Sequence, residues 1–147
     1  MLGSVLSFNV MAAQMTPEQQ AANAVATRQS VFHLLSFSNA PLGSMARGGE
    51  YNEEAAKTAI MRIETLAPMI PEVFGAMDTR QFKDIPTRAN DTIWDNMADV
   101  KKLASDLEAG AKEAMDIINS KGADGVRDAV RAIGPKCGAC HDRFRLD

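Results

Sequence analysis

Apolar residues recur along this chain in alternating steps of three and four positions, the spacing that aligns side chains on one face of an α-helix. The longest regular run consists of Ile93, Met97, Val100, Ala104, Leu107, Ala111, Ala114 and Ile118. This alternation is an a/d heptad seam, the pattern that packs helices into left-handed bundles. We expect the longest helix of the chain here, and its end at Lys121 and Gly122.

A helix near the N-terminus is predicted by its start signal and by its apolar face. Thr16 suits the N-cap, Pro17 the first helical position and Gln19 the third, which together make a capping box. The apolar face includes Val25, Phe32 and Leu35. We expect Pro41 to kink or end this helix, because proline cannot donate a hydrogen bond to the carbonyl four positions earlier. A loop should follow at Gly43, Gly48 and Gly49.

The next predicted helix starts near Asn52, an N-cap residue followed by two glutamates that suit the positive end of a helix. Its apolar stripe is Ile60, Ile63, Leu66 and Ala67. Pro68 and Pro71 should disrupt its C-terminal end. Residues 75–86 show no clear period, so we predict a loop there.

The last predicted helix begins near Asp124 and continues the same alternation. Its core positions are Val126, Val130, Ile133, Cys137, Cys140 and Phe144. Gly134 and Pro135 should distort this helix or start a new turn. Four amphipathic helices with short connections and no strand pattern predict an all-α fold, an antiparallel up-down four-helix bundle in one domain.

Composition and the N-terminus limit the possible functions. The net charge of −3 gives no support for nucleic-acid binding. No catalytic constellation stands out, so we do not expect an enzyme. Residues 1–13 are mildly apolar and end in small residues, which resembles part of a secretory signal without its basic start. They are too short to span a bilayer, which takes about 20 residues. We expect a signal-peptide remnant at residues 1–13, a bundle domain at residues 14–147 and no membrane span.

Both cysteines of the chain stand in the segment Cys137-Gly138-Ala139-Cys140-His141, a C-x-x-C-H pattern. This is the attachment signature of c-type haem: two thiols add to the porphyrin vinyl groups, and the next imidazole reaches the iron. A structural zinc site would need four ligands, yet the only other histidine is His33. A thioredoxin-like site would need a βαβ context. We expect one covalent haem c per chain, bound through Cys137 and Cys140, with His141 as an axial iron ligand.

Residues 17–147 resemble the cytochrome c′ family of four-helix bundles. The resemblance is strongest from Ile133 to Arg145, where an aromatic and a basic residue follow the haem motif. The pairs Ile93-Trp94 and Arg28-Gln29 match positions early in the family's third and first helices. The more familiar cytochromes c match poorly, because their motif lies near the N-terminus and a methionine ligand follows far downstream. We expect no ligand in the short segment after His141.

The resemblance implies further haem contacts. Arg28 matches a family arginine near a haem propionate, a role that suits guanidinium–carboxylate pairing. Arg145 matches an arginine beside the axial histidine, and Phe74, with Met69, matches the family's pocket lining. Trp94 should pack beside the haem or in the core. The complete expected set is Arg28, Gln29, Phe32, Phe74, Trp94, Met97, Phe144 and Arg145.

Phe32 matches the position that covers the open face of the iron. Cytochromes c′ have a hydrophobic residue there, whereas the related low-spin cytochromes c-556 have a methionine ligand. Phenylalanine cannot ligate iron, so we expect a five-coordinate, high-spin iron that binds NO and CO better than O₂, since no distal donor is present. The alternative is a six-coordinate electron-transfer cytochrome of the c-556 type, in which His33 or a methionine reaches the iron. On a helix, His33 points about 100° away from Phe32.

The resemblance implies a protein that binds small gases, transfers electrons, or does both. Covalent haem is attached outside the cytoplasm in bacteria, so we expect a periplasmic protein. The family also implies a homodimer formed through the first two helices, while the redox partner is not indicated. A structural bundle that never receives haem is a third alternative.

Overall fold

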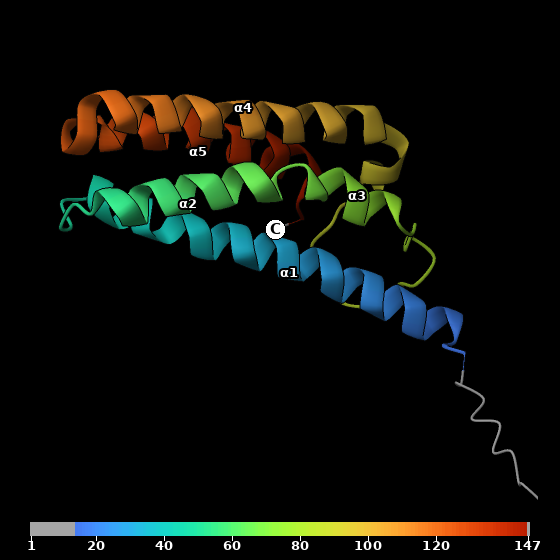
Figure 1. The fold of residues 1–147 in the computed structure, drawn as a ribbon. Helices are drawn as coiled ribbons and strands as arrows, with labels where there is room; N and C mark the ends of the chain where they lie inside the picture. Colours follow the sequence, from blue (N-terminus) through green and yellow to red (C-terminus); the bar gives the residue numbers. More distant parts are fainter. Residues whose placement is uncertain (1–13, 147) are drawn as a thin grey trace, which may run out of the picture.

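A computed structural model describes residues 14–146, and its long helices form a bundle. The helices are α1 (Pro17–Ala46), α2 (Glu53–Leu66), α3 (Met69–Gly75), α4 (Met97–Lys121) and α5 (Val126–Phe144), with the 3₁₀ helices η1 (Asp91–Asn96) and η2 (Gly122–Gly125). α1 packs on α2 in one layer and α4 on α5 in the other, and successive long helices run in opposite directions (Figure 1). The predicted all-α, antiparallel up-down four-helix bundle is confirmed.

The first helix begins as predicted and ends later than predicted. Thr16 Oγ1 accepts a hydrogen bond from the Gln19 amide at 3.2 Å, and Gln19 Oε1 accepts one from the Thr16 amide at 2.9 Å. The prediction that Pro41 could end the helix is wrong, because α1 continues to Ala46. Pro41 removes only the bond to the carbonyl of Phe37, a residue that is 66% exposed, where water can satisfy that carbonyl.

This continuation changes two other expectations. α1 has 30 residues and α4 has 25, so the heptad segment is not the longest helix. Gly43 lies inside α1 rather than in the loop. The turn itself is made by Gly48, whose φ of 98° lies in the left-handed region that favours glycine, and by Gly49.

The middle of the chain follows the prediction closely. Asn52 caps α2, since its side-chain oxygen accepts a hydrogen bond from the Ala55 amide at 2.8 Å. α2 ends just before Pro68, and a short helix, α3, then carries Pro71 in its first turn. Residues 76–90 contain turns and no helix, in agreement with the predicted loop.

The heptad seam of α4 is buried at every predicted position except the partly exposed Met97. Gly122, with a φ of 55°, ends α4 as predicted, and η2 leads into α5. The prediction that Gly134 and Pro135 start a new turn is wrong, because α5 is one uninterrupted helix. Pro135 frees only the carbonyl of Arg131, which lies on the exposed side of α5.

One glycine brings the two C-terminal helices into close contact. A Cβ atom on the buried Gly110 of α4 would lie 2.5 Å from the carbonyl oxygen of Ala132 on α5. Only glycine permits this approach, which fixes α5, and therefore the haem motif, against the rest of the bundle. Across residues 14–146, no helix is both long and apolar enough to cross a bilayer. The predicted signal remnant lies outside the described residues.

Candidate functional site

The C-x-x-C-H motif occupies the C-terminal turns of α5. Cys137 and Cys140 are free, partly buried and packed against the hydrophobic core, so the heptad pattern placed them on the correct side of the helix. Their spacing of three, with His141 four positions after Cys137, puts the three side chains on neighbouring parts of one helix face. The motif therefore presents two thiols and an imidazole together towards the bundle.

The two thiols differ from those of a redox-active C-x-x-C site. Burial raises the pKa of the Cys137 thiol, and burial together with the neighbouring Cys137 raises the pKa of Cys140. Redox-active cysteines have a lowered pKa, often because they lie at a helix N-terminus, whereas this motif lies near the C-terminal end of α5. Within residues 14–146, no cluster of three His, Cys, Asp or Glu side chains could hold a metal ion. The raised thiol pKa values and the position of the motif on α5 disfavour the thioredoxin-like alternative.

His141 is partly buried, and its Nδ1 lies 3.4 Å from Nη1 of Arg145. Burial lowers the pKa of His141, and the positive charges of Arg145 and Arg88 lower it further against the opposing effect of Asp142. The neutral imidazole is the form that binds metals. Arg145 therefore stands beside the predicted axial histidine, as the resemblance implied.

Three aromatic rings from different segments pack together in the same region of the bundle. The ring centroids of Phe32 on α1 and Phe74 on α3 are 6.2 Å apart, and those of Phe74 and Trp94 on η1 are 6.1 Å apart with an interplanar angle of 76°. These distances are typical of attractive aromatic pairs. Trp94 Nε1 also donates a hydrogen bond to the carbonyl of Phe74 at 3.1 Å. We call Phe32, Phe74 and Trp94 the aromatic cluster.

Arg28 joins this cluster to the loop after α3. It is 3% exposed, and its guanidinium carbon lies 5.3 Å from the Phe74 ring centre and 5.2 Å from that of Trp94. Nε donates to the Val73 carbonyl at 3.0 Å, Nη1 donates to Thr79 Oγ1 at 2.8 Å, and Nη2 donates to the Met77 carbonyl. Burial lowers the pKa of Arg28, an effect that Asp78 opposes.

A second set of contacts ties the end of the chain to residues 88–90. The amide of Asn90 donates to the Phe144 carbonyl and the amide of Leu146 donates to the Arg88 carbonyl, both at 2.8 Å, around a bridge between Ala89 and Arg145. We call residues 88–90 and 144–146 the C-terminal strap. The same loop reaches α1, because Gln29 Nε2 donates to the Pro86 carbonyl at 3.3 Å. The loop thus contacts both the first helix and the end of the last.

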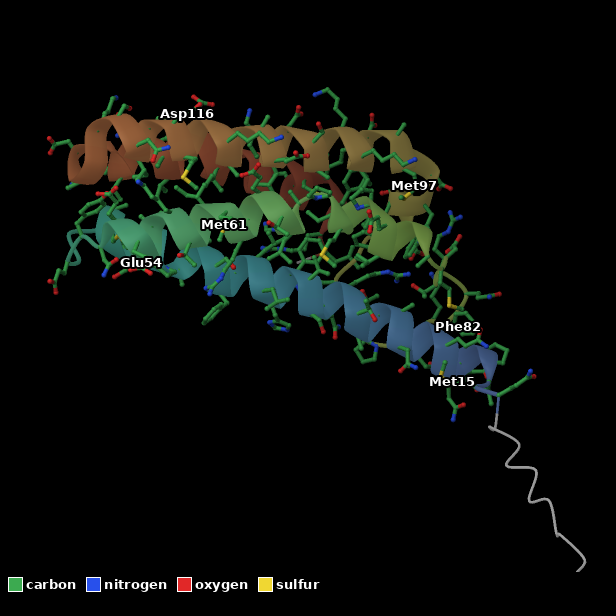
Figure 2. The ribbon with its side chains drawn as sticks, viewed as in Figure 1. Met15, Glu54, Met61, Phe82, Met97 and Asp116 are labelled. Carbon is green, nitrogen blue, oxygen red and sulfur yellow. The ribbon has the colours of Figure 1, made fainter. Side chains whose placement is uncertain are left out.

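The remaining predicted residues fall into three environments. Phe144 is 4% exposed in the core. Met97 lies where α4 begins, next to α3 (Figure 2), and its Cε is 4.0 Å from where a Cβ of Gly75 would stand. His33 is exposed while Phe32 beside it is partly buried, in agreement with the helical geometry expected for the pair. The contacts of Thr79, Pro86 and Arg88 were not predicted, because they lie in a loop without periodicity.

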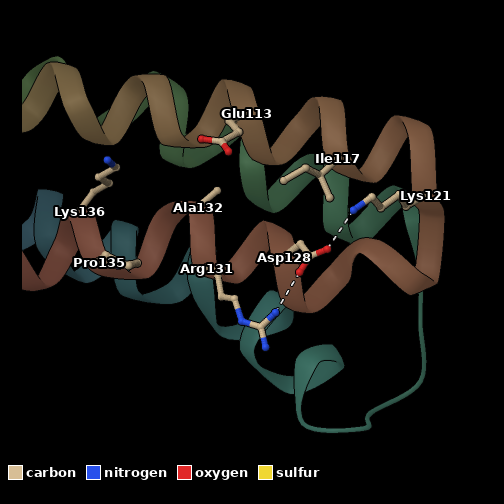
Figure 3. Close-up of a pocket in the computed structure, with 8 residues that line it drawn as sticks. All are labelled: Glu113, Ile117, Lys121, Asp128, Arg131, Ala132, Pro135 and Lys136. Atoms are coloured by element: carbon tan, nitrogen blue, oxygen red, sulfur yellow. Dashed lines mark hydrogen bonds and ion pairs between the residues drawn. The ribbon is translucent and has the colours of Figure 1, made fainter.

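A charged groove of about 440 Å³ lies elsewhere, between α4 and α5 (Figure 3). In its wall, Asp128 forms ion pairs with Lys121 and Arg131, each at 3.0 Å. None of the motif residues lines it. The groove is therefore separate from the candidate site.

The chemistry of the motif and its surroundings fits a covalently attached haem. Two free thiols at the required spacing are followed at once by an imidazole whose pKa is lowered by burial. Arg145 beside His141 is a cation that suits a carboxylate group, whereas the Arg28 guanidinium is buried and donates to Val73, Met77 and Thr79. The residues present therefore match the donor set that haem c requires.

Comparisons with known proteins point in the same direction. A family described as "Cytochrome C'" matches residues 23–145. Cytochrome c-556 of Agrobacterium tumefaciens (strain apple 185) is 31% identical over 106 residues, which cover 71% of this chain and 80% of that protein. Cytochrome c′ of Allochromatium vinosum is 25% identical over 141 residues, covering 95% and 88%. The crystal structure of cytochrome c′ from Thermochromatium tepidum has a TM-score of 0.75 and 26% identity, covering 92% of this chain and all of that one (100%).

Proposed function

The chain belongs to the cytochrome c′ family, and on that premise we propose that Cys137 and Cys140 hold haem c, with His141 as an axial ligand of the iron. The observation that carries the proposal is the grouping of two free, partly buried thiols and one partly buried imidazole on a single face of α5. Bound haem supplies an iron that exchanges one electron and accepts a small ligand at an open axial position.

We further propose that the iron is five-coordinate and that the protein binds NO and CO. The support is the aromatic cluster, in which Phe32 offers an apolar ring and no ligating atom. The nearby cation, Arg28, already donates to Val73, Met77 and Thr79, so it is held away from the role of a distal hydrogen-bond donor. Such a pocket gives little stabilisation to bound O₂, whereas NO and CO need no donor.

An absorption spectrum of the reduced protein with and without CO tests this proposal. We expect a high-spin spectrum that changes on addition of CO. As a matched control, Phe32→Met places a thioether where the ring stands, and we expect the reduced variant to become low-spin. A low-spin spectrum of the unaltered protein that CO does not change would contradict the proposal.

The second candidate is a six-coordinate electron-transfer cytochrome of the c-556 type. It is favoured by the 31% identity to a protein named cytochrome c-556. In that case His33 or a methionine such as Met97 would complete the coordination. Replacement of the responsible residue, in His33→Ala or Met97→Leu, would convert a low-spin spectrum to a high-spin one. If both variants stay high-spin like the parent, this candidate fails for those ligands.

We propose a homodimer that pairs the α1 and α2 faces of two copies. Leu34 and Phe37 of α1 are 51% and 66% exposed, although both are large and apolar. The guanidinium carbon of Arg62 on α2 lies 5.9 Å from the Phe37 ring centre, so the two helices share one surface there. Removal of such a patch from water stabilises a dimer. We call Leu34, Phe37 and Arg62 the α1–α2 face.

The proposed role is that of a gas binder or electron carrier in the bacterial periplasm, rather than that of an enzyme. Its support is chemical, because covalent haem attachment takes place outside the bacterial cytoplasm. Fractionation of cells that produce the full chain would test the location. Haem-containing protein recovered only with the cytoplasmic fraction would contradict it.

A further inference from the structure

We infer that Phe74 is a positioning residue that holds Phe32 in place as the cover of the gas site, and so controls how fast a gas ligand enters. The inference rests on the proposed function, because it assigns a role to a residue behind the proposed cover. It goes beyond that function by naming a side chain that acts through Phe32 rather than on the ligand.

Phe32 has one aromatic neighbour that can restrain it. Its ring meets that of Phe74 at 6.2 Å and 57°, within the range of an attractive aromatic pair. Phe32 is only partly buried, whereas Phe74 is 5% exposed in the core. A partly buried ring keeps one orientation only if a neighbour occupies the alternative space. Phe74 is the neighbour whose ring packs against Phe32.

Phe74 is itself held from two directions. Trp94 contacts its ring edge-on at 6.1 Å and donates an indole hydrogen bond to its backbone carbonyl, so ring and main chain are fixed by one residue. The Arg28 guanidinium, from α1, lies over the Phe74 and Trp94 rings. Its hydrogen bonds to Val73 and Thr79 tie α1 to the backbone and loop on either side of Phe74. Movement of Phe74 would break several contacts at once.

The helix that carries Phe74, α3, needs these contacts to keep its position. α3 has 7 residues, which is too short to be stable without tertiary contacts. Its position therefore depends on the aromatic cluster and on Arg28. A smaller side chain at position 74 would leave Phe32 free to adopt other rotamers, and the path to the gas site would open more often.

The test is a double-mutant cycle on the holoprotein, with the CO association rate of the reduced form as the readout. We expect Phe74→Leu to raise this rate about two- to tenfold. This factor is the free energy of one aromatic pair contact converted to a ratio of rates. In a Phe32→Ala background, Phe74→Leu should change the rate no further, because the restrained ring is gone. Thr79→Val removes one Arg28 acceptor without touching a ring, and it should raise the rate in the same direction by less.

Two measurements separate positioning from lost stability. Ile118→Val also shortens a buried side chain, but at the far end of α4, and it should leave the CO association rate unchanged. The single indole N–H signal of Trp94 in the NMR spectrum of the reduced protein, recorded with and without CO, should broaden or exchange faster in Phe74→Leu, a readout independent of gas entry.

The outcomes are distinguishable. The inference is overturned if CO binds but Phe74→Leu leaves the rate unchanged, or raises it equally in both Phe32 backgrounds. A reduced spectrum that CO does not alter overturns the proposed open site instead, and the indole signal then still reports whether Phe74 orders the cluster.

Discussion

At the scale of single residues, the partner of His141 is unusual. Metal-bound histidines generally donate their second ring N–H to a carboxylate or carbonyl, which increases the electron density at the metal. Here Nδ1 faces the guanidinium of Arg145 at 3.4 Å, and a guanidinium has no acceptor atom. We infer that the Nδ1–H of His141 finds no acceptor at Arg145, so the imidazole donates less electron density to the iron. The guanidinium also adds a positive charge nearby, and both effects disfavour the ferric state.

Replacement of Arg145 should therefore lower the reduction potential. In Arg145→Gln, the charge is removed and the amide oxygen can accept the Nδ1 proton, and both changes stabilise the ferric form. We expect a decrease on the order of tens of millivolts, since the group is exposed and screened. Spectroelectrochemical titration measures the change.

Arg127→Gln provides the matched control. It removes the same charge but lies 14 residues before His141, roughly 21 Å along α5 at 1.5 Å per residue. Its potential should stay close to that of the parent. A potential that rises or stays constant in Arg145→Gln would show that the guanidinium does not act on the axial ligand.

Residues that act through local geometry were predictable from the sequence. The thiol and imidazole spacing, the Thr16 capping box and the Asn52 cap depend on neighbours within four positions. The bonds from Arg28 to Thr79 could not be predicted, because they join segments 51 positions apart and the loop has no pattern. The resemblance assigned Arg28 to a propionate, which stays a prediction, while the structure shows its hydrogen bonds going to Val73, Met77 and Thr79.

At the scale of helices, the wrong predictions concern proline. Pro41 and Pro135 both lie inside continuous helices. A proline costs stability mainly through the carbonyl that it frees, and the cost depends on whether that carbonyl is exposed to water. Exposure is a property of the assembled bundle. The heptad spacing predicted the buried face of α4 well, because that face is set by helix geometry alone.

The α4–α5 contact yields a prediction about two glycines. In Gly110→Ala the new methyl group would lie 2.5 Å from the Ala132 carbonyl, a backbone atom that cannot move alone. We expect a loss of about 1–3 kcal/mol in the free energy of unfolding, as for other overpacked sites. Chemical denaturation of the two proteins measures it.

Gly43→Ala is the control within another helix. Its methyl group would meet only the guanidinium of Arg47, at 3.1 Å, the far end of a flexible side chain. Because alanine favours helix more than glycine, this variant should match the parent or gain up to about 1 kcal/mol. Equal effects of the two substitutions would show that the helices can separate at Gly110 without cost.

At the scale of the whole molecule, helices from both ends of the sequence contact the same loop, residues 76–90. The aromatic cluster comes from α1, α3 and η1, while the motif comes from α5, and residues 76–90 contact both the first helix and the chain end. This loop therefore links the first helix to the end of α5, the helix that carries the motif. The α1–α2 face, in contrast, is left exposed by this arrangement.

A charge on that face should separate the proposed dimer. We expect Phe37→Glu to weaken self-association by roughly 100-fold or more, because an unpaired carboxylate would be buried between the copies. Sedimentation over a range of concentrations measures the dissociation constant. Met61→Glu is the control: Met61 of α2 (Figure 2) is 54% exposed. It lines a separate groove together with Met115 of α4, so dimerisation should persist. Disruption by both variants to the same degree would contradict the proposed face.

The C-terminal strap has a consequence for the order of events during maturation. Attachment of haem requires that a ligating enzyme reach the two thiols, which the folded chain keeps partly buried. The strap closes beside them through the backbone bonds between residues 88–90 and residues 144–146. We infer that these bonds form after the haem is attached, so that the last turns of α5 stay open to the enzyme while the other long helices assemble.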